Sequence, residues 1–392
     1  MKIIRSLDVA PLGPVRLPDS GLGQGWEAGA VFILTVLVLA FGLVTLYSAS
    51  SVFAINQGLA DTFYVTRQGV GALVGLTSLM FCAWMPYRYW AVLAWPLIAA
   101  SVLMLLLCVL PWTHGIAPQI NGARRWLRVG VNIQPSEVAK VAIIVWSAAM
   151  AVKKAPHFQS LRRGLGPFLA VWGLVIGLVT AAPDLSTALV IAALGILIVF
   201  AAGARVAHFV FLGVLVSPAL YFLLFASYRR QRLEVFLQQL SDPTGAGYQV
   251  LQSLIGFGSG GVTGVGFGEG QQKHGFLPEA HNDFIFAMIG EEWGFLGVTI
   301  VVVFYVALVV IGFRIASRAP DLFGELLAIG CTSLIALQAT LHMAVGLALA
   351  PATGLALPLI SYGRSNLIVT LVAIGILISV ARATARVKAA HV

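Results

Sequence analysis

Long apolar segments recur along the whole chain, and short polar connections separate most of them. Ten of these segments have ~17 or more residues, enough to cross the ~30 Å hydrocarbon core of a bilayer as a helix. They are expected at about residues 28–50, 67–85, 90–110, 136–152, 166–182, 185–202, 208–226, 284–312, 325–345 and 366–382. Only helices and closed barrels satisfy their own backbone groups in lipid. The pattern therefore predicts an all-α polytopic membrane protein with about ten transmembrane helices.

One connection is far longer than the others, and it sets the expected domain organisation. It is the polar segment at about residues 227–283, between the seventh and eighth predicted helices. We expect a membrane domain over 28–382 that carries this large loop, with tails at 1–27 and 383–392 and no separate soluble domain. The first tail is too polar for a cleaved signal, because proline, glycine and charge interrupt it before any apolar core begins.

The composition excludes an ordinary soluble protein. The 392 residues are 59% hydrophobic and only 10% charged, whereas soluble chains carry about 25% charged residues. The three cysteines, Cys82, Cys108 and Cys331, lie in apolar segments without the spacing of metal ligands. We interpret them as small core residues, which say nothing about the redox compartment.

The distribution of basic residues predicts the orientation in the membrane. An even number of helices puts both termini on one side, and fourteen lysines and arginines fall on that side against nine on the other. Because connections in the cytoplasm are enriched in lysine and arginine, both termini are predicted to be cytoplasmic. The large loop is then extracytoplasmic.

Two arginine groups stand out on the side that should be poor in arginine. They are Arg124, Arg125 and Arg128, followed by Arg229, Arg230 and Arg232. One interpretation is that they extend to the membrane interface, and the other is that they bind an anion, phosphate above all. The net charge of +9 agrees with contact to anionic lipid head groups. Nucleic acid is not an expected partner, because no basic face exists outside the membrane loops.

Ionisable residues inside the predicted helices are candidates for function, because burying them in a membrane is costly. Glu137 and Lys140 are three residues apart and share one helix face, so they are predicted to form an ion pair. Either the pair is structural, or Lys140 presents its charge to a substrate. Glu291 and Glu292 are predicted to be buried with partners.

Four further features lie at predicted helix ends or in connections. Asp184 precedes a helix, so it is predicted to cap that helix or to bind substrate. Asp283 places a carboxylate at the mouth of the eighth helix, and its neighbour His281 does not complete a metal site with it. Residues 351–365 carry proline and glycine as in a re-entrant or broken helix, which must be buried in protein or line a cavity. The glycine-rich residues 256–270 are predicted to form a loop.

Several independent motifs then converge on one family. In chain order they are NGARRW at 121–126, QPSE at 134–137, PD at 183–184, GYQ at 247–249, QS at 252–253, SGG at 259–261, LPEAHNDFIFA at 277–287 and LPLISYG at 357–363. Together they cover nearly the whole chain, and the chain resembles the SEDS (shape, elongation, division and sporulation) family, the RodA/FtsW group. Glu279 to His281 and Ile289 to Glu292 favour the division type over the elongation type.

The resemblance implies an activity and a location. It implies a peptidoglycan glycosyltransferase with ten helices in the bacterial cytoplasmic membrane, which polymerises lipid II on the outer face. The usual partner of the family is a class B penicillin-binding transpeptidase, within the divisome or the elongasome. By position, Asp283 matches the essential aspartate of the family, Glu137 and Lys140 match a pair that lines its cavity, and Arg124 and Arg125 match a basic pair.

Substrate contacts are further expected at four polar residues, Asp184, His281, Ser361 and Ser365. The chain also departs from the family pattern. Gly363-Arg364-Ser365-Asn366 stands where relatives commonly have Gly-Gly-Ser-Ser, so Arg364 adds a cation at the cavity mouth.

The implied chemistry fits these residue types. The 4-hydroxyl of an N-acetylglucosamine acceptor attacks C1 of a lipid-linked sugar, and undecaprenyl diphosphate leaves with inversion at C1. The hydroxyl is a poor nucleophile and requires a base, for which Asp283 is the candidate. Cations stabilise the leaving diphosphate, and Arg124, Arg125 and Lys140 are available. A divalent cation such as Mg or Mn would also serve, although the sequence contains no complete ligand set for one.

Two other functions agree with the same membrane pattern. A lipid II flippase needs a charged cavity without a catalytic base, and a scaffold for a penicillin-binding protein needs neither. The carboxylate of Asp283 separates these classes, because only the enzyme requires it as a base.

Overall fold

The computed structural model describes most of the chain, with several gaps. The described residues are 25–119, 122–129, 131–158, 160–224 and 247–389. Arg229, Arg230 and Arg232 of the second predicted basic group, and the first part of the large loop, lie outside these residues.

Ten apolar helices occur in the described part of the chain, at the positions that the sequence predicts. They are α1 (Trp26–Asn56), α2 (Phe63–Trp84), α3 (Tyr89–Val109), α4 (Pro135–Lys154), α5 (Gly166–Ala181), α6 (Leu185–Ala201), α7 (Val206–Leu224), α10 (Ile285–Ser317), α11 (Leu322–Gly346) and α12 (Arg364–Ala389). Eight are long and apolar enough to cross a membrane, and α6 and α7 are shorter apolar helices. The predicted class of an all-α polytopic membrane protein with about ten helices is confirmed.

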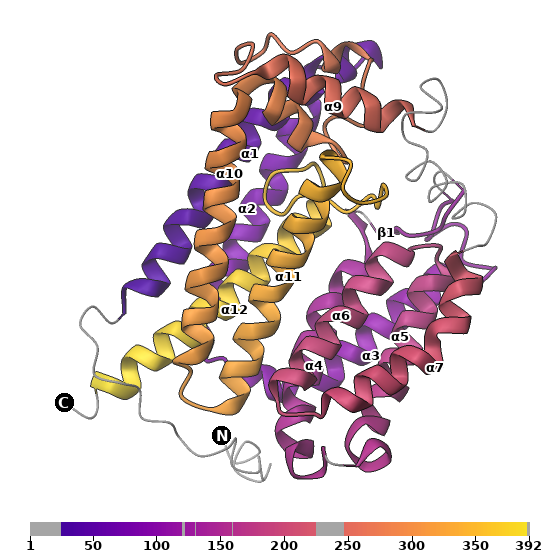
Figure 1. Cartoon of the computed structure of the whole chain (residues 1–392), viewed down its shortest axis with the longest axis vertical. Coiled ribbons are helices and arrows are strands. Elements are labelled where there is room, and N and C mark those ends of the chain that lie inside the picture. The colour runs from indigo at the N-terminus through magenta and orange to yellow at the C-terminus, as the bar shows by residue number, and fades with distance from the viewer. Residues whose placement is uncertain (1–24, 120–121, 130, 159, 225–246, 390–392) are drawn as a thin grey trace.

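The two ends of the helix bundle differ. The amino-terminal end of α1 and the carboxy-terminal end of α12 lie at one end, which we call the terminal side (Figure 1). The opposite end, the loop side, carries helix α9 (Tyr248–Gly260) and the hairpin of β1 (Leu127–Val129) and β2 (Val131–Ile133). In this antiparallel hairpin Arg128 pairs with Asn132.

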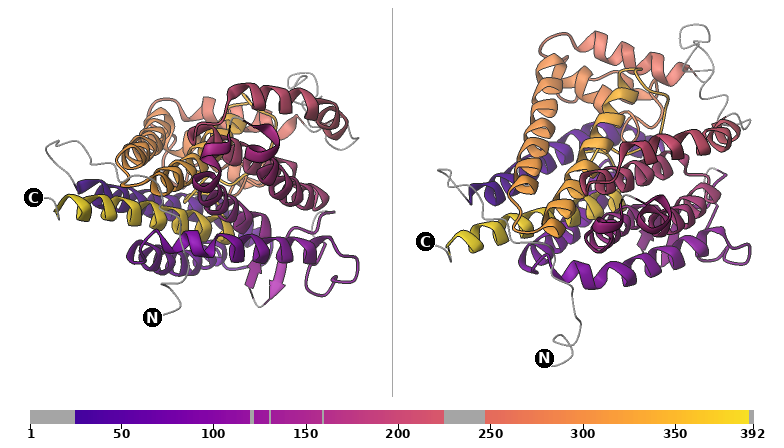
Figure 2. Two further views of the ribbon diagram at one scale, coloured as in Figure 1. Left: turned by 90° about the horizontal axis from the view of Figure 1, so that it is seen from below. Right: turned by 60° about the horizontal axis from the view of Figure 1, so that its bottom comes forward.

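The helices form two groups that meet along α4 and α11. Helices α1, α2, α10 and α12 pack together on one side, and α3, α5 and α6 pack around α4 on the other (Figures 1 and 2). Helix α4 is enclosed by its neighbours, with Ile143, Ile144 and Trp146 fully buried. Because α4 does not face lipid over most of its length, polar side chains at its loop-side end point into protein.

The polar segment before α10 contains a helix that the sequence analysis did not predict. Residues 256–260 of the glycine run, expected to be a loop, form the second half of α9. This helix crosses α10 closely, because a Cβ atom on Gly260 would lie 1.9 Å from the Gly290 carbonyl oxygen. Gly260 therefore allows the close contact between the two helices, and the predicted loop begins only at Gly261, where φ is +55°.

Helix α10 is interrupted at Gly294, where φ is 63° and ψ is −161°. The loop after α9 completes the hydrogen bonding on both sides of this break. The Phe295 N–H donates to the Gly261 carbonyl over 2.9 Å, and the Val265 N–H donates to the Glu291 carbonyl over 3.0 Å. Two further bonds join Leu296 to Val262 and Gly266 to Glu292. The loop thus supplies hydrogen-bond partners for the backbone groups that the break in α10 leaves without helical partners.

Candidate functional site

Asp283 lies in the turn before α10 and meets the irregular segment that precedes α12. Its N–H donates to the Glu279 carbonyl over 3.0 Å, and Glu279 has the left-handed φ of 55° that turns the chain. The half-buried Asp283 side chain reaches Gly354, since a Cβ atom on Gly354 would lie 3.8 Å from Oδ2. Gly354 also has φ +71°, so its position against the carboxylate favours glycine.

His281 lies two residues before Asp283 and is enclosed by aromatic rings. It is 4% exposed, and its ring centroid is 4.7 Å from that of Phe53 and 4.8 Å from that of Tyr64. Its carbonyl accepts a hydrogen bond from the Tyr362 N–H over 3.1 Å. Burial lowers the pKa of His281 to about 4. The imidazole is therefore neutral near pH 7, and its visible role is to join the loop to the segment before α12.

Residues 351–363 form an irregular segment, mostly buried from Leu355 onward, without the helical turns of a broken helix. Side chains from α2 and α11 satisfy its backbone. Gln68 donates through Nε2 to the Ser361 carbonyl over 3.0 Å and accepts at Oε1 from the Gly363 N–H over 3.2 Å. His342 Nδ1 lies 2.7 Å from the Leu355 carbonyl oxygen.

Ser361 itself is buried, and its hydroxyl oxygen accepts from the Leu357 N–H over 2.9 Å. The hydroxyl thus closes a turn within its own segment, and its expected contact with substrate stays a prediction. Gln68 and His342 escaped the sequence analysis. Each is a polar residue in an apolar segment, and such a position indicates a specific hydrogen-bonding role inside a membrane protein.

The predicted ion pair at the loop-side end of α4 is confirmed. Lys140 Nζ lies 2.7 Å from Glu137 Oε1, and Lys140 is 0% exposed. Asn366 of α12 donates through Nδ2 to the second oxygen of Glu137 over 3.0 Å. Each oxygen of the buried carboxylate thus has a partner, which offsets the cost of removing it from water. Asn366, one of the departures from the family pattern, was not foreseen as a partner.

Ser365 joins the start of α12 to the start of α4. Its hydroxyl accepts from the Gln134 N–H over 3.1 Å and lies 3.3 Å from the Asn132 carbonyl oxygen. The hairpin that follows Arg125 therefore ends against α12. Ser365 acts structurally here, and nothing in this geometry tests its predicted contact with substrate.

Asp184 caps α6, as one of the two interpretations predicted. Its Oδ1 accepts from the Thr187 N–H over 3.3 Å. Its Oδ2 accepts from the Ser136 hydroxyl over 3.1 Å and from Gln134 Nε2 over 3.4 Å. The buried carboxylate thereby ties α6 to the first turn of α4, next to Glu137.

Arg124 and Arg125 hold the connection between α3 and α4 in place. Arg124 donates from Nη1 to the Leu110 carbonyl over 3.1 Å and has Nη2 3.0 Å from His114 Nε2. Arg125 donates to the carbonyl of Pro183, the residue before Asp184. The buried Nε of Arg125 has no partner among the described residues. Arg125 therefore belongs to the group around Asp184, whereas Arg124 lies with His114 beside it.

These contacts join the predicted residues into one polar band on the loop side of the bundle. At one end are Asp283, His281 and Ser361, and at the other are Glu137, Lys140, Asp184, Ser365 and Arg125. The five consecutive residues 362–366 connect the two ends, because Tyr362 bonds to His281 and Asn366 bonds to Glu137.

The described residues do not bring together three or more His, Cys, Asp or Glu side chains that could hold a metal ion. Protein groups from this part of the chain thus form no complete site for Mg or Mn. We derive no step through a metal.

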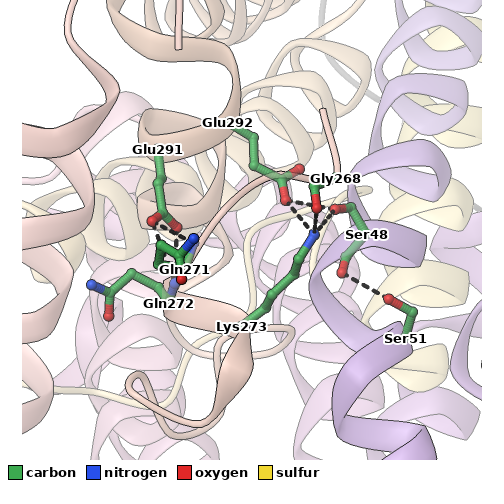
Figure 3. Close-up of polar contacts among 8 residues, drawn as sticks. All are labelled: Ser48, Ser51, Gly268, Gln271, Gln272, Lys273, Glu291 and Glu292. Carbon is green, nitrogen blue, oxygen red and sulfur yellow. Dashed lines mark hydrogen bonds and ion pairs between the residues drawn. The ribbon is translucent and has the colours of Figure 1, made fainter. Parts of the chain in front are cut away.

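Glu291 and Glu292 are buried with partners, as predicted (Figure 3). Glu292 Oε1 lies 3.1 Å from Lys273 Nζ and accepts from the Ser48 hydroxyl over 2.6 Å. Lys273 also donates to the carbonyl of Gly268. Glu291 accepts from the Gln271 N–H over 2.8 Å. The two carboxylates therefore fasten the segment after α9 to α1 and α10.

The sequence and the fold match one family over nearly their whole length. A profile of the FtsW/RodA/SpoVE family, described as cell cycle protein, matches residues 29–386. The chain is 41% identical over 352 residues to a protein of Geobacter metallireducens named probable peptidoglycan glycosyltransferase FtsW, covering 89% of this chain and 93% of that protein. It is 39% identical over 352 residues to stage V sporulation protein E of Bacillus subtilis, covering 89% and 95%.

Solved structures agree. A chain of a structure described as structural coordination of polymerization and crosslinking by a peptidoglycan synthase complex superposes with a TM-score of 0.74 at 31% identity, covering 93% of this chain and 99% of that one. The rod shape determining protein RodA of Thermus thermophilus superposes with a TM-score of 0.65 at 29% identity, covering 93% and 98%. With this agreement in sequence and in helix arrangement, the chain belongs to the FtsW/RodA/SpoVE family.

Proposed function

We propose that this protein is a peptidoglycan glycosyltransferase that polymerises lipid II into glycan strands. Relatives at about 40% identity that carry this activity in their names support the proposal. The observation that carries it is the polar band, in which a half-buried carboxylate, Asp283, lies at one end and a buried ammonium group, Lys140, at the other. A base and a cation are what glycosyl transfer from a diphosphate requires.

In this proposal Asp283 is the general base. Its carboxylate takes the proton of the acceptor 4-hydroxyl while the oxygen forms a bond to C1 of the lipid-linked sugar. The bond from C1 to the diphosphate oxygen breaks on the opposite face, and undecaprenyl diphosphate leaves with the electron pair.

The leaving diphosphate needs positive charge near its oxygens, and the other end of the band supplies candidates. Lys140 lies in a protein interior of low dielectric, where charges act strongly, and Glu137 balances its charge in this structure. Arg124 and Arg125 lie on the loop side, in the connection between α3 and α4. Asp184 and Ser365 position these groups through α6 and α12.

We further propose that the protein lies in the bacterial cytoplasmic membrane with the terminal side in the cytoplasm. The excess of lysine and arginine on that side supports this orientation. A class B penicillin-binding protein is the proposed partner, because a matching structure is described as a complex that coordinates polymerization and crosslinking. The FtsW names of the relatives support membership in the divisome rather than the elongasome.

Purified protein incubated with lipid II tests the activity directly. We expect glycan polymers that separate from lipid II on a gel, formed without another polymerase. A parallel assay places labelled lipid II in vesicles with the protein and measures its movement between leaflets. Movement of lipid II without polymer would favour the flippase function instead. If the protein yields neither polymer nor movement, with or without the partner transpeptidase, the scaffold function would be the remaining explanation.

A further inference from the structure

A cavity of about 230 Å³ lies at the terminal side, far from the polar band. It is bounded by the connection between α2 and α3, the connection between α10 and α11, and α12. Two arginines, Arg88 and Arg382, line it together with Trp84, Tyr87 and Ser379. Its volume is below the ~300–1,000 Å³ of pockets that enclose drug-sized ligands. The cavity is therefore large enough for a small polar head group, while the rest of the ligand molecule would lie outside it.

Both guanidinium groups keep donors for a ligand. Arg88 donates from Nη2 to Asp321 Oδ2 over 3.0 Å, yet its side chain remains 56% exposed. Arg382 donates from Nη1 to the Ala83 carbonyl over 3.3 Å. A guanidinium carries five N–H groups. Among the described residues, these bonds and a 3.4 Å contact from Arg88 Nε to Tyr87 leave several N–H groups of each arginine unused.

The charge balance at the cavity matches a monoanion. Asp321 is fully committed: Oδ2 accepts from Arg88 and from the Tyr87 hydroxyl over 2.6 Å, and Oδ1 accepts from the Gly324 N–H over 2.8 Å to cap α11. Asp321 therefore neutralises one of the two arginines. The net charge of Arg88, Arg382 and Asp321 is +1, and a phosphodiester carries a charge of −1.

The surroundings of the cavity are those of a membrane interface. Trp84, 74% exposed, ends α2 at the rim, and tryptophan is enriched at the level of lipid head groups. Met80 and Phe81, one turn earlier on α2, are exposed apolar side chains that lead from the rim into the bilayer. A lipid bound here would find a path for its acyl chains along α2.

We propose that this cavity binds the phosphate of an anionic phospholipid in the leaflet on the terminal side. Arg88 and Arg382 hold the phosphate from two sides, and Trp84 and the apolar face of α2 receive the upper part of the acyl chains. This site requires only the membrane-embedded fold and does not depend on the proposed glycosyl transfer.

Native mass spectrometry of the full-length protein in detergent tests the site. After delipidation, the protein is given phosphatidylglycerol or zwitterionic phosphatidylcholine at equal concentration. We expect the wild type to retain one phosphatidylglycerol in preference to phosphatidylcholine. Arg382→Gln should weaken this retention roughly fivefold, since one basic residue contributes about 1 kcal/mol to attraction of an anionic lipid. Arg162→Gln is the matched control, because it removes the same charge from an exposed position on the same side and should change nothing.

Two further arms separate the alternatives. Arg382→Lys keeps the charge and should keep most of the preference, and phosphatidylglycerol should raise the melting temperature of the wild type more than that of Arg382→Gln. Equal retention of both lipids by the wild type, or equal losses in Arg382→Gln and Arg162→Gln, would overturn the proposal. If inorganic phosphate alone binds at Arg382 while phosphatidylglycerol shows no preference, the cavity is a free-anion site and the lipid proposal is wrong.

Discussion

Lys273 Nζ lies 3.1 Å from Glu292 Oε1, and both side chains are almost completely removed from solvent. The pair joins the segment after α9 to α10, and Ser48 of α1 donates to the same carboxylate oxygen. This buried ion pair thus helps to attach a long extramembrane segment to two transmembrane helices (Figure 3). The second oxygen of Glu292 is buried without a partner among the described residues. The buried negative charge of Glu292 is therefore compensated mainly by Lys273.

Breaking this pair should destabilise the protein more than removing it. Lys273→Met leaves the Glu292 charge buried and unpaired, and we expect a loss of roughly 3–5 kcal/mol in the free energy of unfolding. The double variant Lys273→Met/Glu292→Gln leaves no charge and should recover part of that loss. Thermal unfolding in detergent measures both. Additive losses in the double-mutant cycle would show that the two groups are not coupled.

The Glu137–Lys140 pair should behave in the same way but should also affect activity. Lys140→Met and Glu137→Gln each leave a buried partner without its opposite charge. Each single variant should therefore lose several kcal/mol of stability or lose the ability to polymerise lipid II. In the double variant the losses should be less than additive. Asn366→Ala serves as a control of intermediate effect, because it removes one hydrogen bond to Glu137, typically about 1–3 kcal/mol for a charged acceptor.

Asp283→Asn tests the proposed base. The amide keeps the size and hydrogen bonding of the side chain but removes its basicity, so polymerisation of lipid II should fall ~10²–10⁴-fold. Folding, membrane insertion and binding of the partner transpeptidase should remain as in the wild type. Gel analysis of the glycan product against time gives the rate.

Glu279→Gln is the matched control for Asp283→Asn. It neutralises a carboxylate four residues away, whose backbone carbonyl holds the turn and is unchanged by the substitution. It should retain activity. A rate near that of the wild type for Asp283→Asn would contradict the assigned role.

His281 should make stability depend on pH. Its pKa is lowered to about 4 in the folded protein by burial, whereas an exposed histidine titrates near 6.5. The unfolded chain therefore binds the proton first as pH falls. The full stability is present above about pH 6.5, and up to about 3 kcal/mol is lost between pH 6.5 and 4. His281→Phe keeps aromatic packing and should lack this component, so the difference in stability between the two proteins should stop changing with pH above about pH 7.

The orientation can be tested by thiol labelling in intact cells. Gln271 is exposed on the loop side, and Lys153 is exposed on the terminal side. In a background without the three native cysteines, Gln271→Cys should react with a membrane-impermeant reagent, and Lys153→Cys should react only after the membrane is opened. The reverse pattern would invert the proposed topology.

The transmembrane helices were predictable because apolar length is a local property of the sequence. The predicted and observed bounds differ mainly at the ends of α1, α10 and α12, where each helix continues past its predicted last residue. Helix α9 was missed for a different reason. Its glycines at 256, 258 and 260 argue locally against a helix. The close contact with Gly290, which lies far along the chain, explains only Gly260.

The candidate site was predictable where both partners lie on one helix. The spacing of Glu137 and Lys140 fixes a shared face, and the pair forms as expected. The partners that come from distant segments were not predictable. Gln68, Asn366 and Lys273 act across more than 18 residues of sequence, as in the 3.0 Å contact between Gln68 and the Ser361 carbonyl. No local pattern specifies which distant backbone or carboxylate group each of them will meet.

The break in α10 at Gly294 has a mechanical consequence. The four backbone bonds between residues 261–266 and α10 replace those that a continuous helix would form, and opening them would leave eight polar groups poorly solvated near lipid. The segment after α9 is therefore held in one register against both parts of α10. A protein that binds this segment from outside would meet backbone that is bonded to the helix beginning at Ile285, two residues after Asp283.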